Sequence, residues 1–138
     1  MTRDDLKSLA DIRVADAEAL LRVQRWPAAY YLLAYAIECA LKACAARQFR
    51  EHEVPDRKFV NDFYVHRLEE LLNLSGLKSA VDVRAKADPL FLTKWSAVRD
   101  WRETSRHDPS ISEAKARDLH SAVTDANYGV LPCLKTQW

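Results

Sequence analysis

The chain has 138 residues, of which 49% are hydrophobic and 30% are charged, a composition typical of one globular domain with a buried core. With 21 Lys and Arg against 20 Asp and Glu, the net charge of +1 gives no overall field for nucleic acid, so such a contact must come from a local patch. Two glycines and five prolines leave little material for turns, which argues against a fold of many short strands.

The first predicted helix runs from about Thr2 to Arg25. Thr2 and Asp5 have the spacing of a cap at its start. Apolar residues recur along it at helical spacing: Leu6, Leu9, Ile12, Ala19, Leu20 and Val23. Trp26 precedes Pro27, which disfavours helical geometry at Trp26, whereas Pro27 suits the first turn of a second helix. We therefore expect two long helices that meet at a tight turn and pack antiparallel.

Residues 27–46 form the most apolar segment, rich in Ala and Leu and free of Gly. Apolar residues point in nearly every direction around this predicted helix, so we expect other helices to surround it. Glu38 and Lys42, spaced i,i+4 with the acid first, are interpreted as a structural ion pair. A membrane span is the alternative for so apolar a run, but two charges in its middle argue against it.

The middle of the chain is less regular. Residues 50–62 are charged, contain Pro55 and lack periodicity, so we expect a surface loop. A short helix should follow over about residues 63–74 and end before Gly76. Its buried face is expected to consist of Leu68, Leu71 and Leu72. Residues 77–87 fit either a short helix or a turn.

A further helix is predicted to start with Asp88 as its cap and Pro89 in its first turn. Arg102 lies at helical spacing from three apolar residues of one face, so we expect Arg102 to be held in a cleft. Those three residues are Phe91, Trp95 and Val98. The pair Asp108-Pro109 should end this helix.

The last predicted helix starts with a capping box between Ser110 and Glu113. Its apolar stripe consists of Ile111, Leu119, Ala122, Val123, Ala126 and Val130. Pro132 should kink or break the helix near its end.

The chain has an odd number of cysteines, Cys39, Cys44 and Cys133, and no C-x-x-C motif. This pattern favours buried, reduced thiols in a cytoplasmic protein. The N-terminal segment has charges where a signal peptide would have an apolar core. The four histidines lack metal-binding spacing, so no metal site and no cofactor are expected.

The segment AAYYLLAYAIECALKA, residues 28–43, resembles the signature helix of the HEPN family of small α-helical domains. His66 to Leu72 is similar to the H-x-L-x-x-L-L helix of many members, and Trp95 to His107 falls where the family has its functional helix. The resemblance spans nearly the whole chain. It implies one all-α domain over residues 1–138, an up-and-down bundle of four to five helices, and a homodimer.

HEPN ribonucleases use an Arg followed four to six residues later by a His, and Arg102 and His107 match this spacing. The resemblance implies metal-independent cleavage of RNA through attack of the 2′-hydroxyl, as in toxin–antitoxin systems. Arg102 would bind the phosphate and His107 would lie near the ribose hydroxyl. Phosphate or ligand contacts would come from Arg99, Arg106 and Trp95.

The alternative is a non-catalytic HEPN module that binds a nucleotide, an anion or a partner protein. Glu103 follows Arg102 where catalytic members often carry Asn, Asp or His, and an acid there would repel a phosphate. Many members also have Arg-Tyr where this chain has Arg106-His107. Family members are often encoded beside a small nucleotidyltransferase antitoxin, which is the expected partner protein.

Structural roles account for the same residues. Arg102 could pair with Glu38, and His107 could meet the dipole at a helix end. Arg47 and His52 repeat the spacing of the motif, so location alone favours Arg102 and His107. A mixed basic cluster is a candidate anion site or simply a solvated face; it comprises Arg84, Lys86, Lys94, Arg99, Arg102 and Arg106, against Asp88, Asp100 and Glu103.

Overall fold

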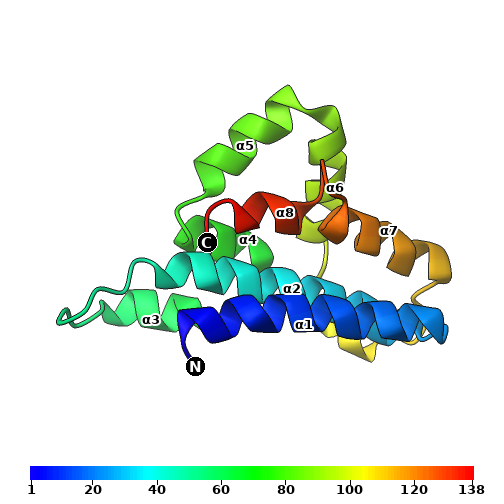
Figure 1. Ribbon diagram of the computed structural model, residues 1–138, viewed down its shortest axis with the longest axis horizontal. Helices are drawn as coiled ribbons and strands as arrows, with labels where there is room; N and C mark the ends of the chain where they lie inside the picture. The colour runs from blue at the N-terminus through cyan, green and yellow to red at the C-terminus, as the bar shows by residue number, and fades with distance from the viewer.

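The computed structural model describes residues 1–138, and all of its regular elements are helices, which confirms the all-α prediction (Figure 1). The chain forms more helices than the four to five expected, because several are short. They are α1 (Arg3–Arg22), α2 (Trp26–Ala46), α3 (Arg57–Phe63), α4 (Leu68–Leu74), α5 (Lys78–Ala87), α6 (Pro89–Arg99), the 3-10 helix η1 (Glu103–His107), α7 (Glu113–Thr124) and α8 (Val130–Lys135).

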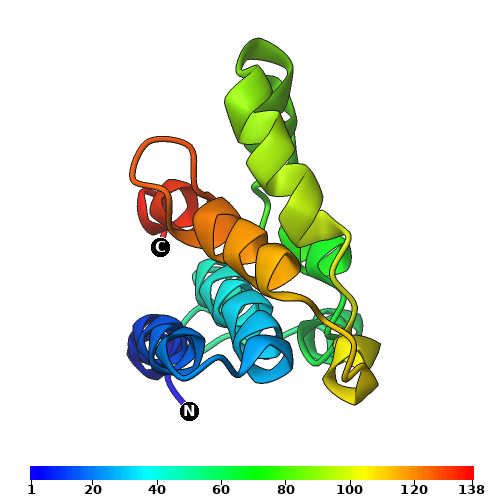
Figure 2. The same cartoon turned by 90° about the vertical axis from the view of Figure 1, so that its right-hand side faces the viewer.

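The two long helices, α1 and α2, lie side by side and run in opposite directions, as the sequence predicts (Figures 1 and 2). The expected capping box is formed: Asp5 N donates to the Thr2 hydroxyl at 3.1 Å, and Thr2 N donates to the Asp5 carboxylate at 2.7 Å. Gln24, with φ 61°, turns the chain between the helices. Pro27 occupies the first turn of α2.

α2 is the centre of the core, because α1, α4, α7 and α8 all pack against it. Its fully buried side chains include Leu33, Ile37 and Leu41. By length and composition α2 alone is apolar enough to cross a membrane, but 72% of the relevant window is buried inside the protein. The surrounding helices therefore explain the apolar character of α2.

Part of the segment expected to be a surface loop is helical. The Asp56 carboxylate caps α3 by accepting from the backbone N–H groups of Lys58 at 2.7 Å and Phe59 at 3.3 Å. Phe59 packs edge-on against Phe49, with ring centroids 5.1 Å apart. The next helix, α4, ends before Gly76, whose φ is 78°. It buries the three residues predicted, Leu68, Leu71 and Leu72.

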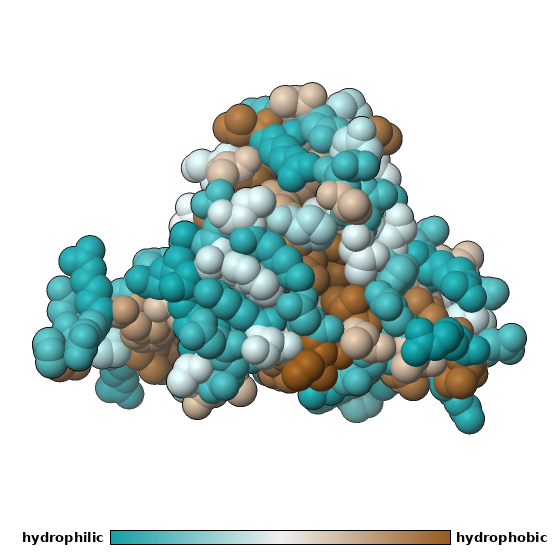
Figure 3. All heavy atoms as spheres, in the orientation of Figure 1, coloured by the Kyte–Doolittle hydropathy of each residue, from teal (hydrophilic) through white to brown (hydrophobic).

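α5 and α6 form an arm that rises from the rest of the molecule (Figures 1 and 2). α5 packs mainly on α6, whereas α6 also packs on α7. The predicted apolar face of α6 is buried through Phe91, Trp95 and Val98. Hydrophilic residues cover most of the face in Figure 3, with apolar residues showing at the tip of the arm. Exposed apolar side chains of the arm are Val83, Leu90 and Leu92.

The helix expected to continue to His107 stops at Arg99, so that part of the prediction is wrong. Asp100 caps it, Arg102 has extended backbone, and the next residues form η1, which packs on α2. Figure 2 shows η1 in yellow at the foot of α6. The break matters for function because the residues of the expected motif lie outside α6.

The last predicted helix is two helices. α7 starts at the Ser112 cap, where Lys115 N donates to the Ser112 hydroxyl at 3.1 Å, and not at Ser110. It ends at Thr124, well before Pro132, which lies inside α8. The turn between α7 and α8 is tight at Gly129, where an added Cβ would lie 2.4 Å from a backbone oxygen.

Candidate functional site

Arg102 does not lie in a cleft. Its side chain is exposed, and its Nη1 donates to the backbone carbonyls of Arg99 and Trp101, each at 2.9 Å. It therefore caps the C-terminal end of α6, where carbonyl groups lack helical partners. The expected burial of Arg102 on the apolar face is wrong, and it forms no ion pair with Glu38, whose partners are other residues.

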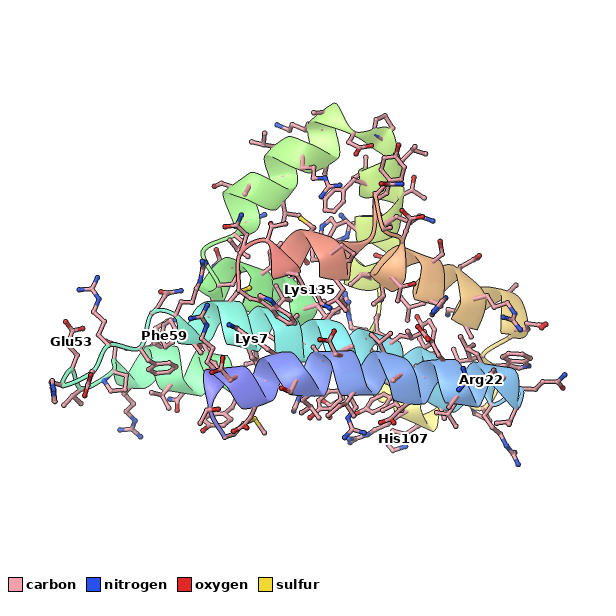
Figure 4. The ribbon with its side chains drawn as sticks, viewed as in Figure 1. Lys7, Arg22, Glu53, Phe59, His107 and Lys135 are labelled. Atoms are coloured by element: carbon pink, nitrogen blue, oxygen red, sulfur yellow. The ribbon has the colours of Figure 1, made fainter.

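Arg106 and His107 lie together in an open cleft of about 500 Å³ between η1 and the start of α2. We call it the η1 cleft; it is lined by Pro27, Ala28, Tyr31, Arg106, His107, Asp108 and Pro109. Arg106 Nε donates to His107 Nε2 at 3.1 Å, so this imidazole nitrogen acts as an acceptor. Arg106 Nη1 also lies 3.0 Å from Glu103 Oε1. Figure 4 shows His107 on the side of the molecule opposite the α5–α6 arm.

Aromatic residues of α2 support the η1 cleft. The Tyr31 ring lies 5.7 Å from that of the buried Trp101, which anchors the chain just before η1. The neighbouring residue of α2, Tyr30, has a raised pKa. Burial raises this pKa most, and the carboxylates of Asp100 and Asp108 raise it further. Asp108 in turn has a lowered pKa because the hydroxyl and backbone N–H of Ser110 both donate to it.

Glu38 is the one charged side chain that the fold buries, with 2% of its surface exposed. Its Oε1 accepts from Lys42 Nζ at 2.8 Å, so the expected intrahelical pair is formed. The same oxygen lies 2.9 Å from His66 Nδ1. His66 Nε2 lies 3.9 Å from Glu103 Oε1 on η1. In the sequence His66 stands out only as the first residue of the H-x-L-x-x-L-L segment. Its contacts with Glu38 and Glu103 were therefore not predicted.

Trp95 and Arg99 lie apart from the η1 cleft. They line a separate groove of about 240 Å³ between α5 and α6, together with Asp82, Ala85, Lys86 and Leu92. Trp95 is itself buried in the core, and Arg99 Nε lies 3.7 Å from Asp100. The residues expected to gather around one ligand are thus divided between two places.

The wider basic cluster is also dispersed. Arg84 stacks over Phe91 and donates to the backbone oxygen of Asn127 at 2.8 Å. Lys94 donates to the Ser121 hydroxyl at 2.8 Å. These cations hold the arm against the rest of the molecule, which leaves Arg106 as the member of the cluster that lines the η1 cleft.

The second Arg–His spacing lies elsewhere. His52 is exposed on the loop after α2, with φ 68°. Its neighbour Glu53 marks that loop at one end of the molecule in Figure 4, far from His107. All three cysteines are free thiols; Cys39 and Cys44 are buried as predicted, and Cys133 is half-buried. No group of three His, Cys, Asp or Glu side chains lies close enough to hold a metal ion.

Comparisons of the chain with known protein families, with curated proteins and with solved structures give no match.

Proposed function

We propose that this protein is an HEPN-like helical domain that binds a phosphate group, carried by a nucleotide or by RNA, in the η1 cleft. The observation that carries the proposal is the placement of Arg106 and His107 side by side in an open cleft next to Tyr31. A guanidinium donates well to phosphate oxygens, and an aromatic ring offers a surface on which a base can stack. This is the binding-module alternative of the sequence analysis, now centred on Arg106 in place of Arg102.

The test is titration of the protein with 5′-AMP and with a short oligoribonucleotide. Arg106→Ala should weaken binding by about tenfold, which corresponds to roughly 1.4 kcal/mol for one charged contact. His52→Ala is the matched control, because His52 is exposed and distant, and it should leave binding unchanged. Equal effects of both substitutions, or no binding by the unaltered protein, would contradict the proposal.

Metal-independent ribonuclease activity of toxin type is the second candidate. It is favoured by the placement of His107 beside Arg106 in the η1 cleft; to act as a base, His107 Nε2 must first release the Arg106 Nε–H that it accepts at 3.1 Å. The imidazole would take the proton of the 2′-hydroxyl while the ribose oxygen attacks phosphorus. The P–O5′ bond then breaks and the imidazolium returns its proton to the leaving 5′-oxygen, which gives a 2′,3′-cyclic phosphate and a 5′-hydroxyl end. The capping role of Arg102 supports Arg106 as the cation on the phosphate.

Cleavage and binding are separated by one set of assays. A nuclease should cut RNA in the presence of EDTA, and His107→Ala should abolish cutting while binding of the oligoribonucleotide persists. Arg102→Ala should leave cutting largely intact and lower the melting temperature, because it removes the cap of α6. Absence of cleavage by the purified protein, with binding retained, would leave the binding module as the function.

The expected partners follow from the HEPN resemblance. They are a second copy of the chain, which would complete a shared cleft, and a nucleotidyltransferase antitoxin in the same cytoplasm. A neighbouring gene for a nucleotidyltransferase would support the pair. Co-purification of the two products, lost when Tyr31 and Arg106 are replaced, would locate their interface at the η1 cleft.

A further inference from the structure

Two hydrogen bonds, an ion pair and one longer charge contact of 3.9 Å connect the core to the η1 cleft. Glu38 Oε1, buried on α2, accepts from Lys42 Nζ at 2.8 Å and lies 2.9 Å from His66 Nδ1. The opposite nitrogen of the same imidazole, Nε2, lies 3.9 Å from Glu103 Oε1, and this Glu103 oxygen is 3.0 Å from Arg106 Nη1. His66 therefore stands between a buried carboxylate and the segment that carries the cleft's cation.

From these contacts we infer that His66 is a positioning residue for the η1 cleft and makes its anion affinity depend on pH. The inference rests on the proposed phosphate binding. η1 is a short 3-10 helix, and its contact with His66 is its single polar side-chain link to a distant part of the chain. The His66 side chain is 47% exposed, so its orientation depends on the 2.9 Å contact with Glu38, which is itself buried.

The protonation state of His66 decides whether the link holds. A doubly protonated imidazole donates through Nδ1–H to Glu38 and presents Nε2–H to Glu103, so one cation attracts both carboxylates. A neutral imidazole keeps Nδ1–H on Glu38 and turns a lone pair toward Glu103, which removes that attraction. The charged groups that face the ring are Glu38 and Lys42 on α2 and Glu103 and Arg106 on η1.

The protonation state of His66 affects the η1 cleft through Glu103. While His66 is protonated, Glu103 is shared between two cations, and Arg106 keeps more of its charge for an anion. When His66 is neutral, Glu103 pairs with Arg106 alone and screens the positive charge of Arg106. Anion affinity should therefore be higher while His66 is protonated than when it is neutral, so it should fall as the pH rises.

Substitutions at His66 separate its two contacts. In His66→Asn the amide nitrogen takes the place of Nδ1, so the bond to Glu38 is kept and the contact with Glu103 is lost. In His66→Gln the amide nitrogen approximates Nε2, so the opposite contact is kept. All variants are made in a His107→Gln background, so that His66 is the one imidazole close to Arg106 and Glu103.

The probe is inorganic sulfate, which stays a dianion across the neutral range, and binding is followed by NMR of the Arg106 Nε–H resonance. His66→Asn should weaken sulfate binding several-fold at acidic pH, abolish the pH dependence and leave the melting temperature unchanged. His66→Gln should lower the melting temperature and keep more of the affinity. Sulfate affinity in His66→Asn with the parent's pH profile would overturn the inference.

Failure of the proposed function gives a different result. If sulfate does not bind the parent at any pH, phosphate binding in the cleft is refuted. The Arg106 resonance without sulfate still tests the link: it should shift with pH in the parent and not in His66→Asn. An identical pH response in both proteins would refute the positioning role by itself.

Discussion

At the scale of single residues, the buried carboxylate of Glu38 has the largest predicted effect on stability. Glu38→Ala leaves Lys42 and His66 without their common partner, and Lys42 is mostly buried. The free energy of unfolding should fall by about 3 kcal/mol, as when one member of a buried pair is removed. Chemical denaturation measures this loss.

The matched control is Glu113→Ala, because Glu113 and Arg117 have the same spacing and order but are about half exposed. Its effect should stay below about 1 kcal/mol, even with the helix dipole included. Equal losses in Glu38→Ala and Glu113→Ala would mean that burial does not strengthen the Glu38 pair.

The thiol of Cys39 supplies a test at alkaline pH. Burial, followed by the nearby Glu38 carboxylate, raises the pKa of Cys39 from 9.0 to about 11. As the pH rises, the thiol therefore loses its proton in the unfolded chain before it does so in the folded protein. The contribution of the Cys39 thiol to stability is complete below pH 9.0 and is lost as the pH rises toward about 11. Cys39→Ala should flatten the fall in melting temperature over that interval; an unchanged slope would contradict the assignment.

At the scale of elements, the sequence predicts helices well where periodicity is strong and caps are clear. The cap of Thr2 on α1, the place of Pro27 in the first turn of α2 and the cap of Asp88 on α6 are all confirmed, although α2 already begins at Trp26, which the sequence places outside a helix. Short helices are harder to predict: α3 depends on one Asp56 cap and on contacts with Phe49, which is not its neighbour in sequence.

The candidate site was predicted less well than the fold, for a physical reason. Periodicity continues past Arg99 in the sequence, but the buried ring of Trp101 and the carbonyl caps from Arg102 end the helix there. Arg102 thus leaves the expected face. The pairing of Glu38 with His66 could not be predicted either, since it joins residues 28 positions apart through tertiary packing.

The two glycines give a matched prediction for turns. Gly129→Ala would place a Cβ 2.4 Å from Asp125 O and 2.7 Å from Asp125 N, so the α7–α8 turn must shift, at more than about 2 kcal/mol. Gly76→Ala meets no atom within 4 Å and should cost only about 1 kcal/mol, from its φ of 78°. Thermal denaturation of both variants tests the order; a reversed ranking would show that the turn at Gly129 is free to relax.

At the scale of the whole molecule, we predict a symmetric dimer. The open η1 cleft suits a site completed by a second copy, and apolar side chains are exposed on α1, at its C-terminal cap and on the arm, among them Ile12, Val23, Val83 and Leu90. Light scattering at high micromolar concentration should give twice the 15.8 kDa of one chain. A mass of 15.8 kDa under those conditions would rule the dimer out.

The projecting arm has a consequence for how the molecule opens. Because α5 rests mainly on α6, it can detach without disturbing the helices around α2. Its amide hydrogens should therefore exchange with deuterated solvent through local openings, long before those of α2, which exchange only when the whole domain unfolds. α5 and the remaining helices, α6 included, should thus behave as two cooperative units.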